Sequence, residues 1–217
     1  MGFPRRNRVL SLAEYEACCK WWAAKKRRTL MQIQKWTAWR LAVNCGLRSK
    51  EIRLLAVGDV HLDVDRPCVI VHRRNAKNCR NAAYSRCVPL TWSPRAIDDL
   101  RAWKEIRTFL HRAKDKDTFL CRLGARAIQG GYLYTPIEHS NLRFWYRYVN
   151  AMALGRARAM ELSPHTGRHT FITHSLYRGV PPIEVCAAAG HTDLTTTTVY
   201  SHLVSDLSNK RTTVFGL

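Results

Sequence analysis

One short stretch of the chain, residues 57–90, most constrains the fold, because it interrupts a sequence that is otherwise rich in helix signals. Its segments VGDVHLDVDRPCVIVHR and RCVPL combine β-branched residues with Asp and Pro, which favours strands and turns over helix. We expect a strand around 68–73 and a returning strand at 86–90, joined by the polar tip RNAKNCRNAAYS. Two strands joined in this way pair antiparallel. The chain is therefore predicted to be mainly α-helical with a small antiparallel β-sheet, an α+β fold.

Helix signals on either side of that stretch predict where the helices begin and end. Ser11 and Glu14 have the spacing of a capping box, so a helix is expected from there through Trp22. A glycine often closes a helix in a left-handed cap, which is the position expected for Gly46 and Gly190. The remaining helices are predicted over 30–45, from about Ser49, from Ser93-Pro94 to about Ala113, and over 139–154, 168–178 and 182–189.

The composition describes a strongly basic globular protein. Its 217 residues suit one large domain, or one domain with a small appendage, and the 46% that are hydrophobic can form a core. Lys and Arg number 36 against 16 Asp and Glu, which gives a formal net charge of +20. Such an excess repels itself in a compact fold and is typical of proteins that bind a polyanion. Nucleic acid is the favoured partner, since no separate basic amphipathic segment suggests a membrane surface.

The cysteines and the apolar runs bear on location. The eight cysteines form no CxxC pair, and most have apolar neighbours, as in VNCGL and EVCAAAG. They are expected to be free thiols in a reducing cytosol rather than disulfides or zinc ligands. The first residues, MGFPRRNRV, lack the apolar core of a signal peptide, and no apolar run approaches the ~18 residues of a membrane-spanning helix. A cytoplasmic, nucleoid-associated protein is predicted.

Several side chains are suited to attack on a phosphodiester. In HTGRH, His165 and Arg168 lie three residues apart and would share one face of a helix. Arg48, in GLRSKEIRLL, stands at a helix start, where the helix dipole disfavours a cation. Tyr200 ends GHTDLTTTTVY, and a phenol with a pKa of about 10 attacks phosphorus well only beside a base or a positive charge. Taken singly, each also has an ordinary explanation. HTGRH also fits a solvated basic turn, Arg48 a surface arginine, and Tyr200 a tyrosine that packs in the core.

The segment GDVHLDVD (58–65) suggests a metal-dependent alternative. Gly-Asp-x-His resembles the first metal motif of metallophosphoesterases, which would use Asp59 and His61. That family normally has a glycine after the histidine, where this chain has Leu62, and it needs a later Asn-His-Glu or Asn-His-Asp block that this sequence lacks. A two-metal site also needs several converging carboxylates and histidines, so this is the weaker hypothesis.

The ordered set of motifs resembles that of the tyrosine recombinase (phage integrase) family, over nearly the whole chain. CGLRSKEIRLL resembles the family's first arginine box, with Arg48 and the accompanying Glu51. Glu51 is expected to pair with a nearby basic residue or to cap the turn. RCVPL resembles the end of its hairpin, which makes Lys77, the lone lysine of that region, the candidate for the hairpin lysine. SPHTGRHTFITH resembles the His-x-x-Arg box. AAGHTDLTTTTVYSH resembles the last box, with His191 followed nine positions later by Tyr200.

The resemblance implies cleavage and rejoining of DNA through a 3′-phosphotyrosyl link, with release of a 5′-hydroxyl. Because the covalent link keeps the energy of the phosphodiester, no metal, ATP or other cofactor is implied. The resemblance also implies a role for each catalytic residue. Tyr200 would be the nucleophile, His165 would orient or deprotonate it, and Lys77 would protonate the leaving oxygen. Arg48 and Arg168 would contact the nonbridging oxygens, and His191 would donate to one of them.

The resemblance also implies an organisation and partners. Residues 11–217 would form the catalytic domain and residues 1–10 a basic linker or arm, with the family's usual separate N-terminal DNA-binding domain absent. The partner would be double-stranded DNA, bound by a homo-oligomer, a tetramer. Gly167 replaces an apolar residue usual in the family and is expected to loosen the start of its helix. A type IB topoisomerase and a catalytically silent DNA-binding module remain as alternatives.

Overall fold

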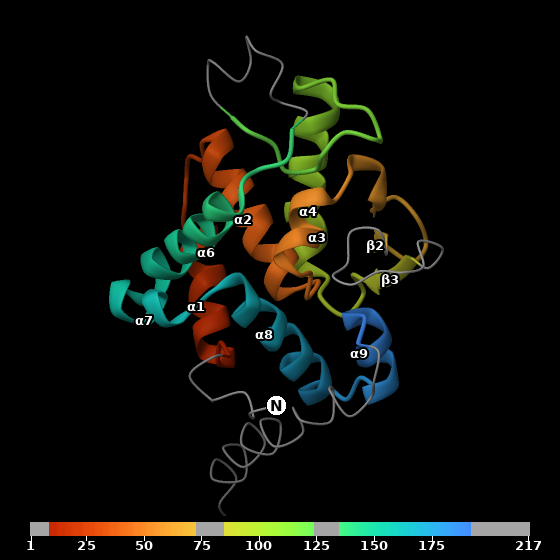
Figure 1. Ribbon diagram of the computed structural model, residues 1–217. Helices are drawn as coiled ribbons and strands as arrows, with labels where there is room; N and C mark the ends of the chain where they lie inside the picture. The colour runs from red at the N-terminus through yellow and green to blue at the C-terminus, as the bar shows by residue number, and fades with distance from the viewer. Residues whose placement is uncertain (1–8, 73–84, 124–134, 192–217) are drawn as a thin grey trace, which may run out of the picture.

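The chain folds as a layered set of helices with a small sheet along one side (Figure 1). This computed structural model describes residues 9–72, 85–123 and 135–191. The helical elements are α1 (Leu12–Ala23), α2 (Leu30–Val43), α3 (Ser49–Leu54), the 3-10 turn η2 (Val57–Asp59), α4 (Arg95–Glu105) with its π-helical continuation η4 (Ile106–Leu110), α6 (His139–Leu154), α7 (Arg156–Glu161), α8 (Pro164–Tyr177) and α9 (Pro182–Ala189).

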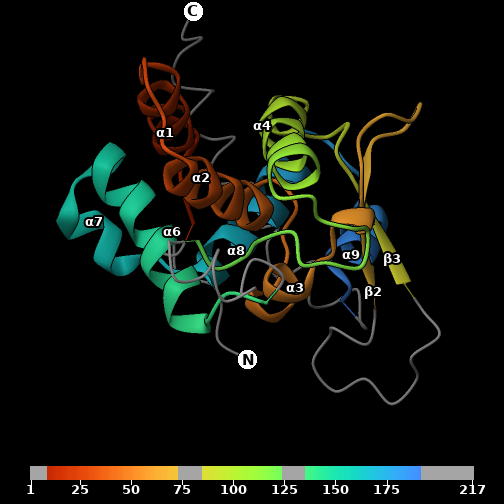
Figure 2. The same ribbon diagram turned by 90° about the horizontal axis from the view of Figure 1, so that it is seen from above.

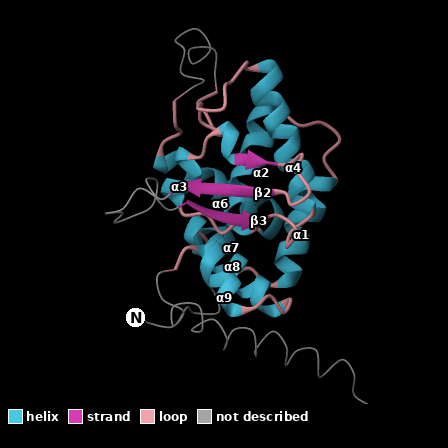
Figure 3. Ribbon diagram, turned by 90° about the vertical axis from the view of Figure 1, so that its right-hand side faces the viewer, coloured by secondary structure: helices cyan, strands magenta, loops and turns pink. Residues whose placement is uncertain are grey.

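The sheet has three antiparallel strands in the order β1 (Val60–His61), β2 (Cys68–His72) and β3 (Ser85–Pro89). Val69 pairs with Val60 on one side and with Val88 on the other, and all three are fully buried. Figure 2 shows the sheet at the edge of the helical part, and Figure 3 shows the three strands lying side by side in front of the helices. The predicted small antiparallel sheet is confirmed.

The helix ends follow the capping signals closely. The Ser11 hydroxyl accepts a hydrogen bond from the Glu14 N–H, and the Glu14 carboxylate accepts one from the Ser11 N–H, so the predicted capping box is present. Gly46 follows α2 at φ +61, where a Cβ would lie 2.3 Å from the Phe171 ring. Gly190 closes α9 in the left-handed conformation, as expected. Most predicted helices agree with the observed bounds to within two residues.

Two helical regions differ from the prediction. The helix expected over 168–178 begins four residues earlier, at Pro164, since Pro164 is preorganised for a first helical turn that Ser163 caps. Gly167 therefore lies inside α8, where a Cβ would approach the Ala42 Cβ to 2.8 Å. It permits close packing of α8 on α2, within a helix that begins three residues before it; the expected loosening of the helix start stays a prediction. The short helix α7 was not predicted.

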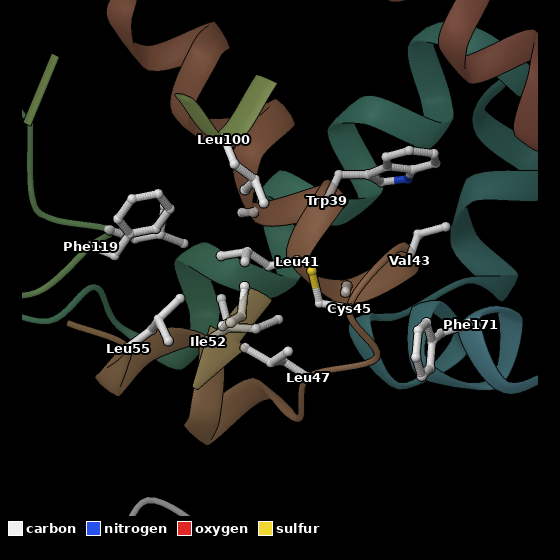
Figure 4. Packing of buried hydrophobic residues seen from close by; sticks show 14 of the residues in the cluster. Trp39, Leu41, Val43, Cys45, Leu47, Ile52, Leu55, Leu100, Phe119 and Phe171 are labelled. Atoms are coloured by element: carbon white, nitrogen blue, oxygen red, sulfur yellow. The ribbon is translucent and has the colours of Figure 1, made fainter. Parts of the chain in front are cut away.

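The core centres on α2, which packs against α4, α6 and α8. Its Trp36 and Trp39 rings stack 4.7 Å apart, and Trp22 of α1 extends the stack at 5.0 Å from Trp36. Figure 4 shows side chains from α2, from the turn after it and from α3, among them Leu41, Leu47 and Ile52, gathered in one cluster. Burial of this many large apolar groups fixes the turn that precedes Arg48.

The structure also describes the state of the cysteines and the length of the apolar helices. The seven cysteines there are all free thiols. No helix among the described residues is both long and apolar enough to cross a bilayer.

Candidate active site

The site is built where α9 ends, beside β3 and the N-terminal half of α8. In Figure 1, α9 lies directly below β3, although about a hundred residues of sequence separate them, and the two elements are in contact. The last residue of α9 and the glycine after it are followed at once by His191. Segments distant in sequence therefore supply side chains to one small region.

Arg168 is held rigidly at this point by α8. Its side chain is only 3% exposed, and its two terminal nitrogens donate to different carbonyl oxygens, that of Gly46 at 2.7 Å and that of Ala189 at 2.5 Å. One bond goes to the turn before Arg48 and the other to the end of α9. The plane of the guanidinium is thereby fixed by two separate elements.

Arg48 lies at the start of α3 and reaches the same region. Its Nη2 donates to the Gly190 carbonyl at 3.1 Å, and its Nη1 donates to the Glu51 carboxylate at 3.1 Å. Glu51 also accepts the Arg48 backbone N–H at 2.7 Å. Glu51 was expected to pair with a basic residue or to cap this turn, and the structure shows both contacts.

Arg86, on β3, is a part of the site that the sequence analysis missed. Its Nη1 and Nη2 bind the two Glu51 carboxylate oxygens at 2.9 and 2.7 Å, and its Nε donates to the Ala188 carbonyl at 2.8 Å. Burial alone would raise the pKa of Glu51, but Arg86 and then Arg48 outweigh it and lower that pKa. The motif RCVPL contains this arginine, but it predicted only a strand.

Three arginines thus bind three consecutive carbonyl groups. We call the carbonyls of Ala188, Ala189 and Gly190 the α9 carbonyl cluster; Arg86, Arg168 and Arg48 bind them in that order. The C-terminal end of a helix carries partial negative charge, which suits cations. The cluster orients the three guanidinium groups. Among the groups joined by these bonds, three arginines stand against the one carboxylate of Glu51, so the group keeps a net positive charge.

His191 follows the cluster and stays neutral. Its backbone N–H donates to the Cys186 carbonyl at 3.0 Å, which fixes where the side chain leaves the main chain. Burial, and after it the charges of Arg168, Arg48 and Arg86, lower the pKa of His191 to about 4. At neutral pH its imidazole can donate one N–H without adding a charge.

His165 is an exposed residue in the first turn of α8, the helix that carries Arg168. Its ring meets the ring of His169, one turn later, at 4.3 Å between centroids and an interplanar angle of 77°. His165 and Arg168 thus lie on the same helix, because α8 begins earlier than the helix predicted over 168–178. Lys77 and Tyr200, the other two predicted catalytic residues, lie outside the residues that the structure describes.

The metal motif suggested by GDVHLDVD is not supported by the fold. The Asp59 carboxylate accepts the Ala56 N–H at 3.0 Å and lies 2.9 Å from His72 Nε2, so it closes a turn and braces β2. Among the residues described, no group of three or more His, Cys, Asp or Glu side chains converges. The metallophosphoesterase hypothesis therefore lacks its ligand set in this part of the chain.

Comparison with known proteins identifies the family. A sequence profile described as "Phage integrase family" matches residues 15–206. The chain belongs to the phage integrase family. The match covers the first arginine box, the hairpin, the His-x-x-Arg box and the last box, so the resemblance seen in the motifs is confirmed.

Relatives and solved structures agree with that assignment. Tyrosine recombinase XerA of Saccharolobus solfataricus is 27% identical over 202 residues, which cover 93% of this chain and 55% of that protein. A crystal structure of XerA recombinase superposes with a TM-score of 0.69 at 19% identity, over 98% of this chain and 65% of that one. XerH recombinase, in a post-cleavage complex with a palindromic difH substrate, gives 0.69 at 18% identity, over 95% and 53%. The fold is that of these recombinases, and the chain spans about half the length of the curated relative.

Proposed function

We propose that this chain is the catalytic part of a site-specific tyrosine recombinase, which cleaves and rejoins double-stranded DNA through a 3′-phosphotyrosyl intermediate. One observation carries the proposal: Arg48 and Arg168, from separate boxes of the family, are oriented by neighbouring carbonyls of the α9 carbonyl cluster, directly beside His191. Family membership links that geometry to phosphoryl chemistry.

The two arginines are suited to the charge of a phosphate in transfer. In such a transition state negative charge spreads over the nonbridging oxygens, and donors that are already oriented stabilise it most. Arg48 and Arg168 are each held by hydrogen bonds to main-chain carbonyls, so little reorganisation is needed when DNA binds. We assign both guanidinium groups to the nonbridging oxygens.

His191 and His165 take different roles. The neutral His191 imidazole donates its N–H to a nonbridging oxygen, and its low pKa keeps it a donor and not a further cation near neutral pH. His165, exposed on the first turn of α8, accepts the phenolic proton or orients the tyrosine. The contact with the His169 ring restrains that imidazole.

Tyr200 and Lys77 complete the reaction. The phenolic oxygen of Tyr200 forms a bond to phosphorus as the bond from phosphorus to the 5′-oxygen breaks. Lys77 gives a proton to that departing oxygen, and the phenolic proton passes to His165. The reverse steps, with the 5′-hydroxyl of another strand as nucleophile, rejoin the DNA. Because the phosphotyrosyl bond keeps the phosphodiester energy, the reaction as proposed uses neither ATP nor metal.

The same proposal covers organisation and partners. We assign residues 11–217 to the catalytic domain and residues 1–10 to a basic linker or arm. Exchange of strands between two duplexes needs two cuts in each, so four copies of the active site, and we infer a tetramer on DNA. The solved XerH complex with its difH substrate supports DNA as the partner. From a DNA substrate we infer a location on the nucleoid in the cytoplasm.

Capture of covalent complexes tests the proposal. The protein is incubated with a library of nicked duplexes of many sequences, and adducts that resist SDS are recovered and sequenced. We expect adducts at a defined set of sequences, formed equally well in EDTA, and none with Tyr200→Phe. Tyr177→Phe, which changes a half-buried tyrosine of α8, is the matched control and should form adducts normally.

Three other results would each contradict the proposal in a different way. Adducts without sequence preference, together with relaxation of supercoiled plasmid, would indicate a type IB topoisomerase. Binding with no adduct on any sequence would indicate a silent DNA-binding module. Cleavage that EDTA abolishes and Mg²⁺ or Mn²⁺ restores would indicate a metal-dependent phosphoesterase.

A further inference from the structure

Arg86 makes a bidentate pair with a buried carboxylate, which distinguishes it from Arg48 and Arg168, the arginines assigned to DNA. Each of its three guanidinium nitrogens has a protein acceptor: Nη1 and Nη2 bind Glu51, and Nε binds the Ala188 carbonyl. The fork geometry of the pair with Glu51 is the strongest arrangement that an arginine makes with a carboxylate. These bonds use three of its five N–H donors, and the pair with Glu51 directs the fork of the guanidinium at that carboxylate.

Glu51 is shared between Arg86 and Arg48. Its side chain is fully buried, and its Oε1 atom accepts both Arg86 Nη1 at 2.9 Å and Arg48 Nη1 at 3.1 Å. A buried carboxylate that loses one cation attracts the remaining one more strongly, since an uncompensated buried charge is costly. Without Arg86, Arg48 would be drawn into a tighter pair with Glu51 and away from the Gly190 carbonyl.

Arg86 also braces the end of α9. Its aliphatic part lies against Gly190, where a Cβ would meet the Arg86 Cδ at 2.9 Å and its Nε at 3.0 Å. With the bond to Ala188, this contact fixes the backbone from which His191 extends. One side chain of β3 therefore contacts both the partner of Arg48 and the segment that precedes His191.

We propose that Arg86 is a positioning residue: by neutralising Glu51 and bracing the α9 carbonyl cluster, it keeps Arg48 directed toward the DNA phosphate and His191 beside it. This inference rests on the proposed recombinase function. Strand β3 then has a role besides pairing with β2, because its Arg86 neutralises the Glu51 carboxylate beside Arg48.

The experiment measures single-turnover cleavage at saturating protein, at a temperature where circular dichroism shows every variant folded. Arg86→Met is expected to cleave about 10²-fold more slowly, the usual effect of losing one oriented donor at such a site. Arg86→Lys keeps the charge but loses the fork and should lie between Arg86→Met and the wild type. Arg95→Met removes an exposed arginine paired with Glu16 on the surface and serves as the matched control, with an unchanged rate.

Two further readouts separate positioning from a general loss of structure. Glu51→Gln combined with Arg86→Met removes the unbalanced carboxylate and should recover at least about tenfold of the lost rate. A substrate with a neutral methylphosphonate at the scissile position needs less positive charge, so the defect of Arg86→Met should be several-fold smaller on it than on ordinary phosphate. A purely structural defect would slow both substrates by the same factor.

The results distinguish a failure of the positioning role of Arg86 from a failure of the recombinase proposal. An Arg86→Met rate within about threefold of wild type, or an equal defect on phosphate and methylphosphonate, would overturn the positioning role and leave the recombinase proposal standing. Absence of any covalent adduct from the wild-type protein would overturn the recombinase proposal, and this inference with it.

Discussion

Two buried arginines, Arg40 of α2 and Arg168 of α8, show how differently one type of side chain is used in the core and in the candidate active site. Arg40 is 4% exposed and Arg168 is 3% exposed. Arg40 donates to the Asp99 carboxylate at 2.8 Å and to the Tyr15 hydroxyl at 2.9 Å, and its guanidinium lies 4.6 Å from the Trp36 ring centroid. Arg168 donates instead to the carbonyl oxygens of Gly46 and Ala189.

The difference indicates what each arginine is for. A carboxylate cancels the formal charge of a buried guanidinium, and the aromatic stack around Arg40 completes a structural ion pair. Carbonyl groups orient a guanidinium but do not cancel its charge, which suits a site that receives an anion. Arg40 should therefore matter for stability and Arg168 for cleavage.

The largest expected effect is on the rate of Arg168→Lys. Lysine keeps the charge but cannot bind the Gly46 and Ala189 carbonyls in a planar fork, so cleavage should fall on the order of 10²–10³-fold. Single-turnover adduct formation on a nicked duplex measures it, below the melting temperature of both proteins. A rate within threefold of wild type would remove the distinction drawn between the two arginines.

Arg40→Met should show the opposite behaviour. It leaves the part-buried Asp99 carboxylate without its cation, which should lower the free energy of unfolding by about 3 kcal/mol. The cleavage rate of the folded fraction should stay within about threefold of wild type, since in the described part of the chain Arg40 binds Asp99, Tyr15 and Asn44 and not Arg48, Arg168 or His191. Urea denaturation with Arg40→Met and with Arg40→Met/Asp99→Asn provides the comparison; equal destabilisation by the two would argue against the charge explanation.

Acid should destabilise the fold through two histidines with lowered pKa values, His174 and His191. Burial lowers the pKa of His174 to about 4, and its Nε2 donates to the Leu10 carbonyl at 2.9 Å. An unfolded histidine titrates near pH 6.5, so the unfolded chain binds more protons between pH 6.5 and 4 and stability falls as the pH falls through that window. At pH 5 this one group should cost about 2 kcal/mol relative to pH 7.

His174→Gln tests that window. Glutamine keeps a donor for the Leu10 carbonyl but does not titrate, so its unfolding free energy should depend less on pH between 6.5 and 4 than that of the wild type. His191 contributes a pH dependence of the same sign, because its pKa is also lowered to about 4, and this part should remain in His174→Gln. Superimposable pH profiles for variant and wild type would show that His174 is not the titrating group.

The smallest expected effect is that of Gly167→Ala. The added Cβ would approach Ala42 Cβ to 2.8 Å and Tyr146 Cε2 to 3.1 Å, so α8 must shift on α2 at a cost of about 1 kcal/mol or somewhat more. Because Arg168 follows directly, a modest loss of cleavage should accompany the loss of stability. Thermal melting of the variant checks this; unchanged or higher stability would mean that α8 and α2 are not packed as closely as described.

Local signals in the sequence predicted most of the fold. The capping box at Ser11, the glycine at position 190 and the β-branched run at 68–73 are decided by neighbouring residues, and all three regions have the expected structure. The start of α8 and the helix α7 were missed. Arg158 holds α7 by binding Glu14 of the distant α1 at 2.6 Å, a contact that local sequence does not reveal.

The site was predicted in part, for the same reason. Arg48, Arg168 and His191 belong to ordered motifs, and the structure brings them to one place. Arg86 was missed because its role depends on contacts with Glu51 and α9 that only the folded chain creates. Lys77 and Tyr200 stay predictions, since both lie outside the described residues.

The most direct test of the account is to identify the amino acid that becomes linked to DNA. Adducts formed on the nicked library are digested with nuclease and trypsin, and the peptide that retains a nucleotide is sequenced by mass spectrometry. The account predicts a 3′-phosphotyrosyl bond at Tyr200, reached from the site that Arg48, Arg168 and His191 form. A nucleotide on any other residue, or a linkage through the 5′-phosphate, would contradict it.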